Sequence, residues 1–535
     1  GLPEAGVWRK AQQGAQQSRG CQTPAVLSDH AGVQTRFTAS SSTQTEPQEQ
    51  NLQEGGLGGP DPPGLVDFLK RVEDTVTKEL EKNSRSHAFD GYHANWEEGS
   101  DHVSLLHSLQ HPGAEESGLH VSAVSWSCTG SVIVCAYGRT DDGDWTHQKS
   151  CVCLWNLDRR SLRPKQADLV LEVPAAVTSV CCHPERPALI AGGLYNGEVV
   201  VWDTSRTQDP VLAQTGMSAD SHREPVYQVV WVPLQKKGDF GVLSSSSGGE
   251  VLLWLVDPDQ GRLVLNAAYA FVRQQLPHSS SLKSRGSSRV GVSALALSPW
   301  DADSFLVGSE GGLLLRCSFS CGPPAAVAPE GRSVAPRAPA RFCFRPAGGP
   351  VHSLHCSPFH RYRLPPPQTA AVLTRSDPTR LHRNLFISAG TDGEVRLGSL
   401  LQADPLLAVR VSDSYVFQAQ WSPSRPLVFA AATGQGNPTR QLRTEPEPFL
   451  TRLCSAGEVQ IFDLARKSLR PAATIRDGAA DRTATCLAFN GADRRLLAAG
   501  RSDGTVGVWR LSSDLTEQRA EESLRLEQIA NQVAE

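Results

Sequence analysis

The feature that most constrains this chain is a pattern that occurs seven times between residues 119 and 511. Each copy has an apolar run typical of a strand, a second run that ends in small residues, a tight turn, and a third run. The third runs end at or near Trp155, Trp202, Trp254, Cys317, Gly398, Phe462 and Trp509. One such unit cannot bury its apolar face alone, so neighbouring units must stack to build a core.

The turns between the second and third runs read YNG, SGG, EGG, TDG and SDG. Glycine adopts positive φ at little cost and Asn or Asp tolerates it, so we expect each turn to close a β-hairpin. Equivalent positions lie 47, 52, 63, 81, 64 and 47 residues apart, against roughly 40–45 for one blade of a propeller. The sequence therefore predicts an all-β fold, a β-propeller of about seven blades over 119–511 whose closed ring leaves no open sheet edge. The copies ending at Cys317 and Gly398 are the most degenerate.

Two stretches interrupt this spacing, at 362–383 and 437–457. Both are rich in proline and arginine and lack the alternation of a strand. Removing them would join SPFHR to NLFISAGTDG and GQG to EVQIFDL, and would reduce two spacings to 59 and 43 residues. We interpret them either as loop insertions outside the fold or as intron-derived sequence, and sequencing the transcript distinguishes the two.

The segments outside the repeats differ in composition. Residues 1–64 are rich in Gln, Ser, Thr, Gly and Pro, and we expect a disordered arm because they cannot bury enough apolar surface. Residues 65–84 have the pattern of an amphipathic helix that either packs on its own domain or binds a partner. Its apolar face comprises Leu65, Phe68, Leu69, Val72, Val76 and Leu80. We treat 85–118 as a connector and 512–535 as a helical C-terminal tail.

Composition and motifs argue against several functional classes. The net charge of −4 gives no basic field for nucleic acid, and no apolar run approaches the roughly 18 residues needed for membrane insertion. The first residues also lack the apolar core of a signal peptide. We find no GxxxxGK[ST], HExxH or GxSxG motif, so we predict no catalytic residues, no enzymatic activity and no cofactor.

The 13 cysteines include no CxxC pair, and most lie in apolar runs. We expect buried, reduced thiols. Cys317 and Cys321 have no second pair, and His102, His107, His111 and His120 resemble no ligand set. The sequence therefore predicts no metal site.

The third run of the second copy ends in VWD, residues 201–203, which resembles the signature of WD repeats. The aromatic rings at these ends are large enough to pack one sheet against its neighbour. The blade residues that we assign in this way are Trp155, Trp202, Asp203, Trp254, Phe462 and Trp509. An alternative is a WD-repeat scaffold of another complex, such as a substrate receptor of a ubiquitin ligase. Its adaptor box would resemble W-D-x-R, whereas Arg206 comes one residue too late.

Within the arm, Thr43, Gln44 and Thr45 resemble the extended peptide that a small dimeric dynein light chain binds as an added strand. The order of arm, helix and propeller resembles the dynein intermediate chains. Four segments resemble more specifically those of cytoplasmic dynein-2: SHAFDGYHANWEE (86–98), GLHVSAVSWSCTGSVIVCAYGR (118–139), CLWNLDRRSLRP (153–164) and RPLVFAAATGQG (425–436).

This resemblance implies a non-catalytic subunit of the motor for retrograde intraflagellar transport and cilium assembly. Its propeller would bind the dynein-2 heavy chain, and the chain would pair with the second dynein-2 intermediate chain. The partners of the N-terminal region would be dimeric light chains of the TQT-binding, roadblock and Tctex types, with the helix at 65–84 facing the roadblock type. The resemblance also implies a location in the cytoplasm, on the cytoskeleton and in the cilium, at the axoneme, basal body and centrosome.

Overall fold

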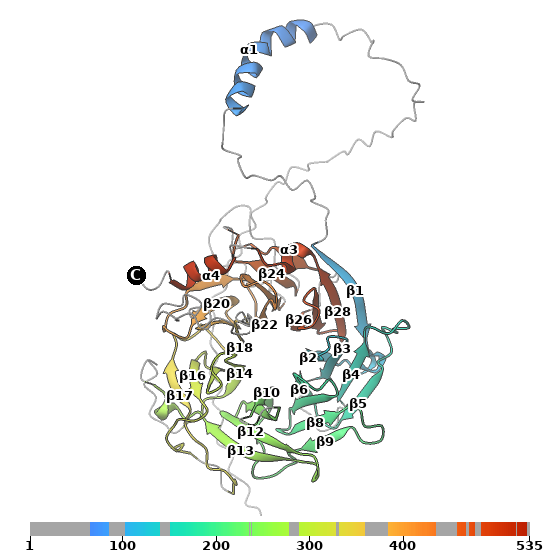
Figure 1. Cartoon of the computed structure of the whole chain (residues 1–535), viewed down its shortest axis with the longest axis vertical. Coiled ribbons are helices and arrows are strands. Elements are labelled where there is room, and N and C mark those ends of the chain that lie inside the picture. Colours follow the sequence, from blue (N-terminus) through green and yellow to red (C-terminus); the bar gives the residue numbers. More distant parts are fainter. Residues whose placement is uncertain are drawn as a thin grey trace, which may run out of the picture. The chain divides into compact units, whose positions relative to one another are not determined.

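The chain divides into two units, Gly1–Asn95 and Trp96–Glu535, which we describe separately. The computed structural model describes residues 65–84, 102–139, 150–234, 236, 238–277, 288–327, 331–358, 384–434, 457–466, 470–476, 483–519 and 522–531. The first unit contributes helix α1 (Leu65–Ser84), and the second is the ring of sheets in Figure 1. No helix in these ranges is both long and apolar enough to span a bilayer. Apart from Gly457, the stretches 362–383 and 437–457 lie outside the described residues, so our interpretation of them stays a prediction.

Four-stranded antiparallel units, which we call blades 1 to 7, make up the ring. Blade 1 consists of β2 (His120–Trp126), β3 (Val132–Gly138), β4 (Ser150–Asn156) and β5 (Leu169–Val173). Blade 2 consists of β6 (Val177–Cys182), β7 (Leu189–Leu194), β8 (Val199–Asp203) and β9 (Val211–Gln214). Blade 3 consists of β10 (Val226–Pro233), β11 (Phe240–Ser246), β12 (Glu250–Asp257) and β13 (Arg262–Ala270). One parallel pair between Gln214 and Arg262 joins blades 2 and 3 into a single eight-stranded sheet.

The next three blades repeat this order. Blade 4 consists of β14 (Val292–Leu297), β15 (Ser304–Ser309), β16 (Leu314–Ser318) and β17 (Ala340–Cys343). Blade 5 consists of β18 (Val351–Cys356), β19 (Leu385–Gly390), β20 (Glu394–Ser399) and β21 (Leu407–Arg410). Blade 6 consists of β22 (Val416–Trp421), β23 (Val428–Thr433), β24 (Val459–Asp463) and β25 (Ala473–Ile475). The first strand of each blade lies nearest the centre of the ring (Figure 1). The predicted all-β propeller is confirmed.

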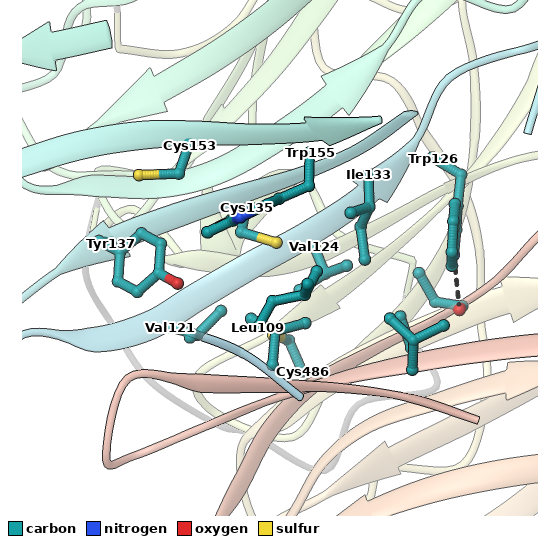
Figure 2. Packing of buried hydrophobic residues seen from close by; sticks show 14 of the residues in the cluster. Leu109, Val121, Val124, Trp126, Ile133, Cys135, Tyr137, Cys153, Trp155 and Cys486 are labelled. Carbon is teal, nitrogen blue, oxygen red and sulfur yellow. Dashed lines mark hydrogen bonds between the residues drawn. The ribbon is translucent and has the colours of Figure 1, made fainter. Parts of the chain in front are cut away.

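Blade 7 joins the two ends of the propeller. It consists of β26 (Ala484–Phe489), β27 (Leu496–Arg501), β28 (Thr505–Leu511) and, as outer strand, β1 (Val103–Gln110). β1 pairs with β28 antiparallel, from Val103 opposite Leu511 to Gln110 opposite Thr505. Part of the segment 85–118 that we expected to be a connector is therefore a strand of the fold, because the ring closes by pairing its N-terminal strand with its C-terminal ones. Figure 2 shows Leu109 of β1 in the same core as Ile133 and Trp155 of blade 1.

A β-bulge in the first strand of each blade organises the centre of the ring. The ladder to the second strand skips one residue there, at Ser122, Thr178, Tyr227, Ser293, His352, Phe417 and Thr485. A bulge re-aims the side chain of the skipped residue. Four of them donate a hydroxyl hydrogen bond to a carbonyl of another blade: Ser122 to Val177, Thr178 to Val226, Ser293 to Val351 at 2.7 Å, and Thr485 to Val121 at 2.6 Å. The bond from Thr485 to Val121 connects blade 7 to blade 1 and so helps to close the ring.

Two third strands do not end in an aromatic residue, and in those blades the neighbouring second strand carries the aromatic ring. The residue that ends the third run pairs directly with a second-strand residue in each blade: Ile133–Trp155, Ile190–Trp202, Val242–Trp254, Phe305–Cys317, Phe386–Gly398, Phe429–Phe462 and Leu497–Trp509. Where the third strand lacks an aromatic ring, the second strand supplies one. A Cβ at Gly398 would lie 2.4 Å from Cζ of Phe386, so the phenylalanine ring fills the space that tryptophan fills elsewhere.

The predicted hairpin turns are present with the expected backbone. The last glycine of each turn, Gly197, Gly249, Gly312, Gly393 and Gly504, has a φ between 77° and 90°. At Gly393 the constraint is also steric, because a Cβ there would lie 2.0 Å from the carbonyl oxygen of Ser412. A residue with a side chain would therefore be both strained and obstructed at this position.

The remaining described helices are short. They are α2 (Pro112–Glu116), the 3-10 turn η1 (Arg273–Gln275), α3 (Ser513–Thr516) and α4 (Glu522–Asn531). Leu515 of α3 packs into a core of blades 6 and 7, and Leu526 of α4 packs into a core of blades 5 and 6. Arg425 lies buried between them. Its guanidinium donates to the carboxylates of Asp463 and Glu522, and to the carbonyl of Asp514 at 2.6 Å. The C-terminal segment is thus fastened to blade 6 by charge as well as by apolar contact.

Candidate partner-binding surfaces

Helix α1 carries an apolar face whose described side chains are largely exposed. Phe68 is 49% exposed, Leu69 52% and Leu80 63%, while Val76 is similarly exposed and Val72 is half-buried. Leu65 is the first residue of the helix. Most helical stability in proteins comes from packing of an apolar face and not from intrinsic helix propensity. The face is therefore of the kind that a partner covers.

The charged side chains of α1 cover this face only in part. The guanidinium of Arg71 lies 5.8 Å from the centre of the Phe68 ring, and Lys82 pairs with Glu79 at 3.4 Å. Both charges of the Lys82–Glu79 pair are exposed, so this contact contributes little to helix stability. Thr43, Gln44 and Thr45 of the arm lie outside the described residues. Their light-chain role remains a prediction.

The predicted blade residues lie inside the fold and not on its surface. The following side chains are at most 3% exposed: Trp155, Trp202, Trp254, Phe462 and Trp509. Asp203 is partly exposed and accepts hydrogen bonds from the backbone amide of Ser205 at 3.0 Å and from its hydroxyl at 2.6 Å. It shapes the turn after β8. Arg206 lies 3.9 Å from the same carboxylate and so belongs to this turn as well.

Sequence reasoning missed an aromatic group at one mouth of the central channel. We call Tyr227, His352, Tyr415 and Phe417 the aromatic rim. Three of these residues stand at the bulged position where other blades carry Ser or Thr. The rings of His352 and Phe417 stack at 6.2 Å, and Tyr415 meets Phe417 edge-on at 6.3 Å. Tyr415 is 51% exposed and Tyr227 39% exposed. Aligning the seven copies on the valine or alanine before this position would have revealed the group.

The aromatic rim has a cost for the fold. Phe417 has no hydroxyl, and within the described residues neither Tyr227 nor His352 makes the bond to the next blade that Ser122 and its equivalents make. Burial raises the pKa of the Tyr227 phenol and lowers that of the His352 imidazole, so both rings are neutral near pH 7. Blades 3, 5 and 6 therefore present neutral aromatic rings where the other blades make a hydroxyl-to-carbonyl bond, and the stack of His352 on Phe417 connects blades 5 and 6 instead. Aromatic residues are enriched at protein interfaces.

The geometry defines the class of protein as a WD-repeat propeller with an appended amphipathic helix. Residues 473–510 match the family described as "WD domain, G-beta repeat", and residues 141–238 match "Dynein axonemal intermediate chain 3 WD40 domain".

Among curated proteins, the chain is 43% identical to "Cytoplasmic dynein 2 intermediate chain 2" of Mus musculus, over 98% of this chain and 90% of that protein. It is 46% identical to the Homo sapiens protein of the same name, over 89% and 81% of the two chains. A "Cytoplasmic dynein 1 intermediate chain" of Drosophila melanogaster is 23% identical, over 66% of this chain and 49% of that protein. The chain belongs to the family of cytoplasmic dynein 2 intermediate chains, and the resemblance inferred from its sequence is confirmed. Dynein intermediate chains are scaffold-type subunits and not a known class of enzyme.

Proposed function

We propose that this chain is a non-catalytic intermediate chain of the cytoplasmic dynein-2 motor, acting in retrograde intraflagellar transport and cilium assembly. Its propeller binds the heavy-chain tail, and its N-terminal region binds dynein light chains. The observation that carries this proposal is the combination of an exposed apolar face on α1 and a closed propeller, in a chain 43–46% identical to dynein 2 intermediate chains. Its location follows the motor: cytoplasm, cytoskeleton and cilium.

The N-terminal region supplies several weak contacts in series. Thr43–Thr45 add a strand to the sheet edge of one light-chain dimer, and α1 places Leu69 and Val72 against a roadblock-type dimer. A Tctex-type light chain and the second intermediate chain complete the assembly. Once one light-chain dimer joins the two intermediate chains, the next contact is intramolecular, at an effective concentration on the order of mM. Two chains are thereby held together without a large interface.

We assign the heavy-chain contact to the face of the propeller that carries the aromatic rim. This surface is partly exposed, neutral and aromatic, and its bulged side chains do not make the hydroxyl-to-carbonyl bond that joins other blades. These are properties of interface centres more than of the general surface. Replacing Tyr415 and Phe417 by Ser should weaken heavy-chain recovery while α1 still recovers its light chains. Equal recovery of the heavy chain by this variant would move the contact to another face.

The separation of roles is tested by co-purification of the tagged chain. A chain lacking residues 1–84 should retain the heavy chain and lose all light chains. Replacing both Leu69 and Val72 by Asp should remove only the roadblock type, since a buried unpaired charge costs several kcal/mol. The matched control places Asp at Glu73 and Glu79, on the polar face of the same helix. Gln44→Ala should weaken only the TQT-binding light chain.

The competing function is a scaffold or substrate receptor of another complex, such as a ubiquitin ligase. The same purification separates the two functions. Co-elution of a cullin adaptor in place of a motor heavy chain and light chains would overturn the proposal. The turn at Asp203 and Arg206 gives this alternative no support, because both side chains are used locally.

A further inference from the structure

A cluster of metal-binding side chains lies where the ring closes. The ligand atoms of His111, Cys151 and Cys153 all lie within 4.8 Å of one another. His111 directly follows β1, the outer strand of blade 7, whereas both cysteines lie on β4 of blade 1. The backbone amide of Gln110, the residue before His111, also bonds the carbonyl of Pro164 at 2.9 Å. The cluster therefore bridges the N-terminal closing strand and the first blade.

We propose that His111, Cys151 and Cys153 bind one zinc ion that fastens the closure of the propeller. Two thiolates and one neutral imidazole are a donor set that zinc prefers. The two sulfur atoms lie 3.8 Å apart. Two thiolates that each bind zinc at about 2.3 Å in tetrahedral geometry are about 3.8 Å apart, so the pair already has the spacing of a tetrahedral edge.

The sulfur spacing also separates this site from a disulfide. A bonded pair of sulfurs would be about 2.05 Å apart, and cysteines two residues apart on a strand have Cα atoms near the upper limit for a disulfide. Unbonded thiols in an apolar core are common, and Cys135 opposite Cys153 is such a residue. The imidazole within reach of both sulfurs distinguishes Cys151 and Cys153 from Cys135.

The surroundings fit a neutral, partly shielded metal site. Cys153 is fully buried and Cys151 nearly so, while His111 is half-buried and leaves a route for entry. Two thiolates balance the charge of a divalent ion, so the loaded site carries no net charge into the core.

Tyr137 lies beside the proposed site. Its side chain is buried beside His111, with ring centroids 6.1 Å apart, and lies in the same core as Cys153 in Figure 2. Its hydroxyl is buried and completes no hydrogen bond of normal geometry within the described residues, although the backbone of His111 lies near it. Buried hydroxyls in native proteins normally have a partner.

The proposal is tested on the full-length chain, reduced and stripped of metal. Zinc is added against a chromophoric chelator, and cobalt is used in a second titration to report thiolate coordination by charge-transfer absorption. We expect one zinc per chain and a cobalt spectrum with thiolate bands. Since loss of an outer-shell partner alone weakens metal sites by about 10–100-fold, replacing both Cys151 and Cys153 by Ala should weaken zinc by more than about 100-fold.

The controls separate metal binding from folding. His111→Ala changes a half-buried residue and should also lose zinc while the chain stays folded, whereas Cys317→Ala, in the core of blade 4, should bind zinc normally. Zinc should raise the Tm of the wild-type chain and of Cys317→Ala, and leave that of His111→Ala unchanged, because binding stabilises only a folded site. Substoichiometric zinc in the wild-type chain, a cobalt spectrum without thiolate bands, or equal zinc affinity in His111→Ala would overturn the proposal.

Discussion

The propeller and helix α1 use similar apolar residues in opposite ways. Trp155 and Phe386 in the propeller are at most 2% exposed, whereas Phe68 and Leu80 on α1 are 49% and 63% exposed. The difference arises because each blade meets a neighbour that covers its face, whereas no described residue outside α1 belongs to the first unit. Burial of each large side chain is worth about 1.5–3 kcal/mol, so the propeller has a source of stability that α1 lacks until a partner arrives.

The largest effect should come from breaking the aromatic compensation in blade 5. Phe386→Ala removes a ring that fills the space over Gly398 and should cost about 3–5 kcal/mol in the free energy of unfolding. Gly398→Trp should be similarly damaging, because its side chain would meet the Phe386 ring. Denaturant titration measures both. Combining Phe386→Val with Gly398→Trp recreates the Val242–Trp254 pair of blade 3 and should recover part of the loss. If the double variant loses as much free energy of unfolding as Phe386→Val and Gly398→Trp lose separately, added together, the two positions do not compensate for each other.

Breaking the Arg425 contacts should come next. Arg425→Ala leaves the buried carboxylates of Asp463 and Glu522 without their cation, at a cost of about 3–5 kcal/mol. Limited proteolysis should then cut first near α4, since this network and Leu526 hold that helix. The control is Arg410→Ala. Arg410 forms an ion pair with Asp413 in which both side chains are exposed, so its loss should cost less than about 1 kcal/mol. Equal stability of the two variants would show that the C-terminal segment is not fastened in this way.

A smaller effect should appear on acidification. His222 bonds the hydroxyl of Ser244 at 2.7 Å, and that oxygen also accepts from the Trp254 indole at 2.8 Å. Burial, with a smaller contribution from Arg332, lowers the pKa of His222 to about 3. Between about pH 6.5 and 3 the unfolded chain therefore binds more protons than the folded chain. The free energy of unfolding should decrease as the pH is lowered through this window. His222→Gln should flatten that slope, although burial also lowers the pKa of His355 to about 4. An unchanged slope in His222→Gln, measured by thermal unfolding, would contradict the assignment.

Local patterns were sufficient to predict the ring. The glycine turns and the aromatic residues that end most third strands recur from repeat to repeat, and both follow from short-range geometry. The helix at 65–84 was predictable for the same reason, because its apolar spacing is local. The compensation by Phe305 and Phe386 was also within reach, since it needs only an alignment of the second strands.

Contacts that form only when the ring closes could not be predicted from local sequence patterns. β1 has an ordinary strand pattern, and only the pairing of Val103 with Leu511 across the whole propeller makes it part of blade 7. The approach of His111 to Cys151 and Cys153 follows from that same pairing, so no local spacing reveals it. Arg425 and Glu522 likewise meet only because α4 returns to blade 6.

Amide hydrogen exchange on the full-length chain, alone and with a purified roadblock-type light-chain dimer, tests the contrast between the two regions most directly. We expect the amides of blades 1 to 7 to be strongly protected in both samples, and the amides of Leu65–Ser84 to exchange quickly in the free chain and slowly in the complex. Strong protection of Leu65–Ser84 in the free chain, or no change on adding the dimer, would contradict a helix whose stability comes from its partner.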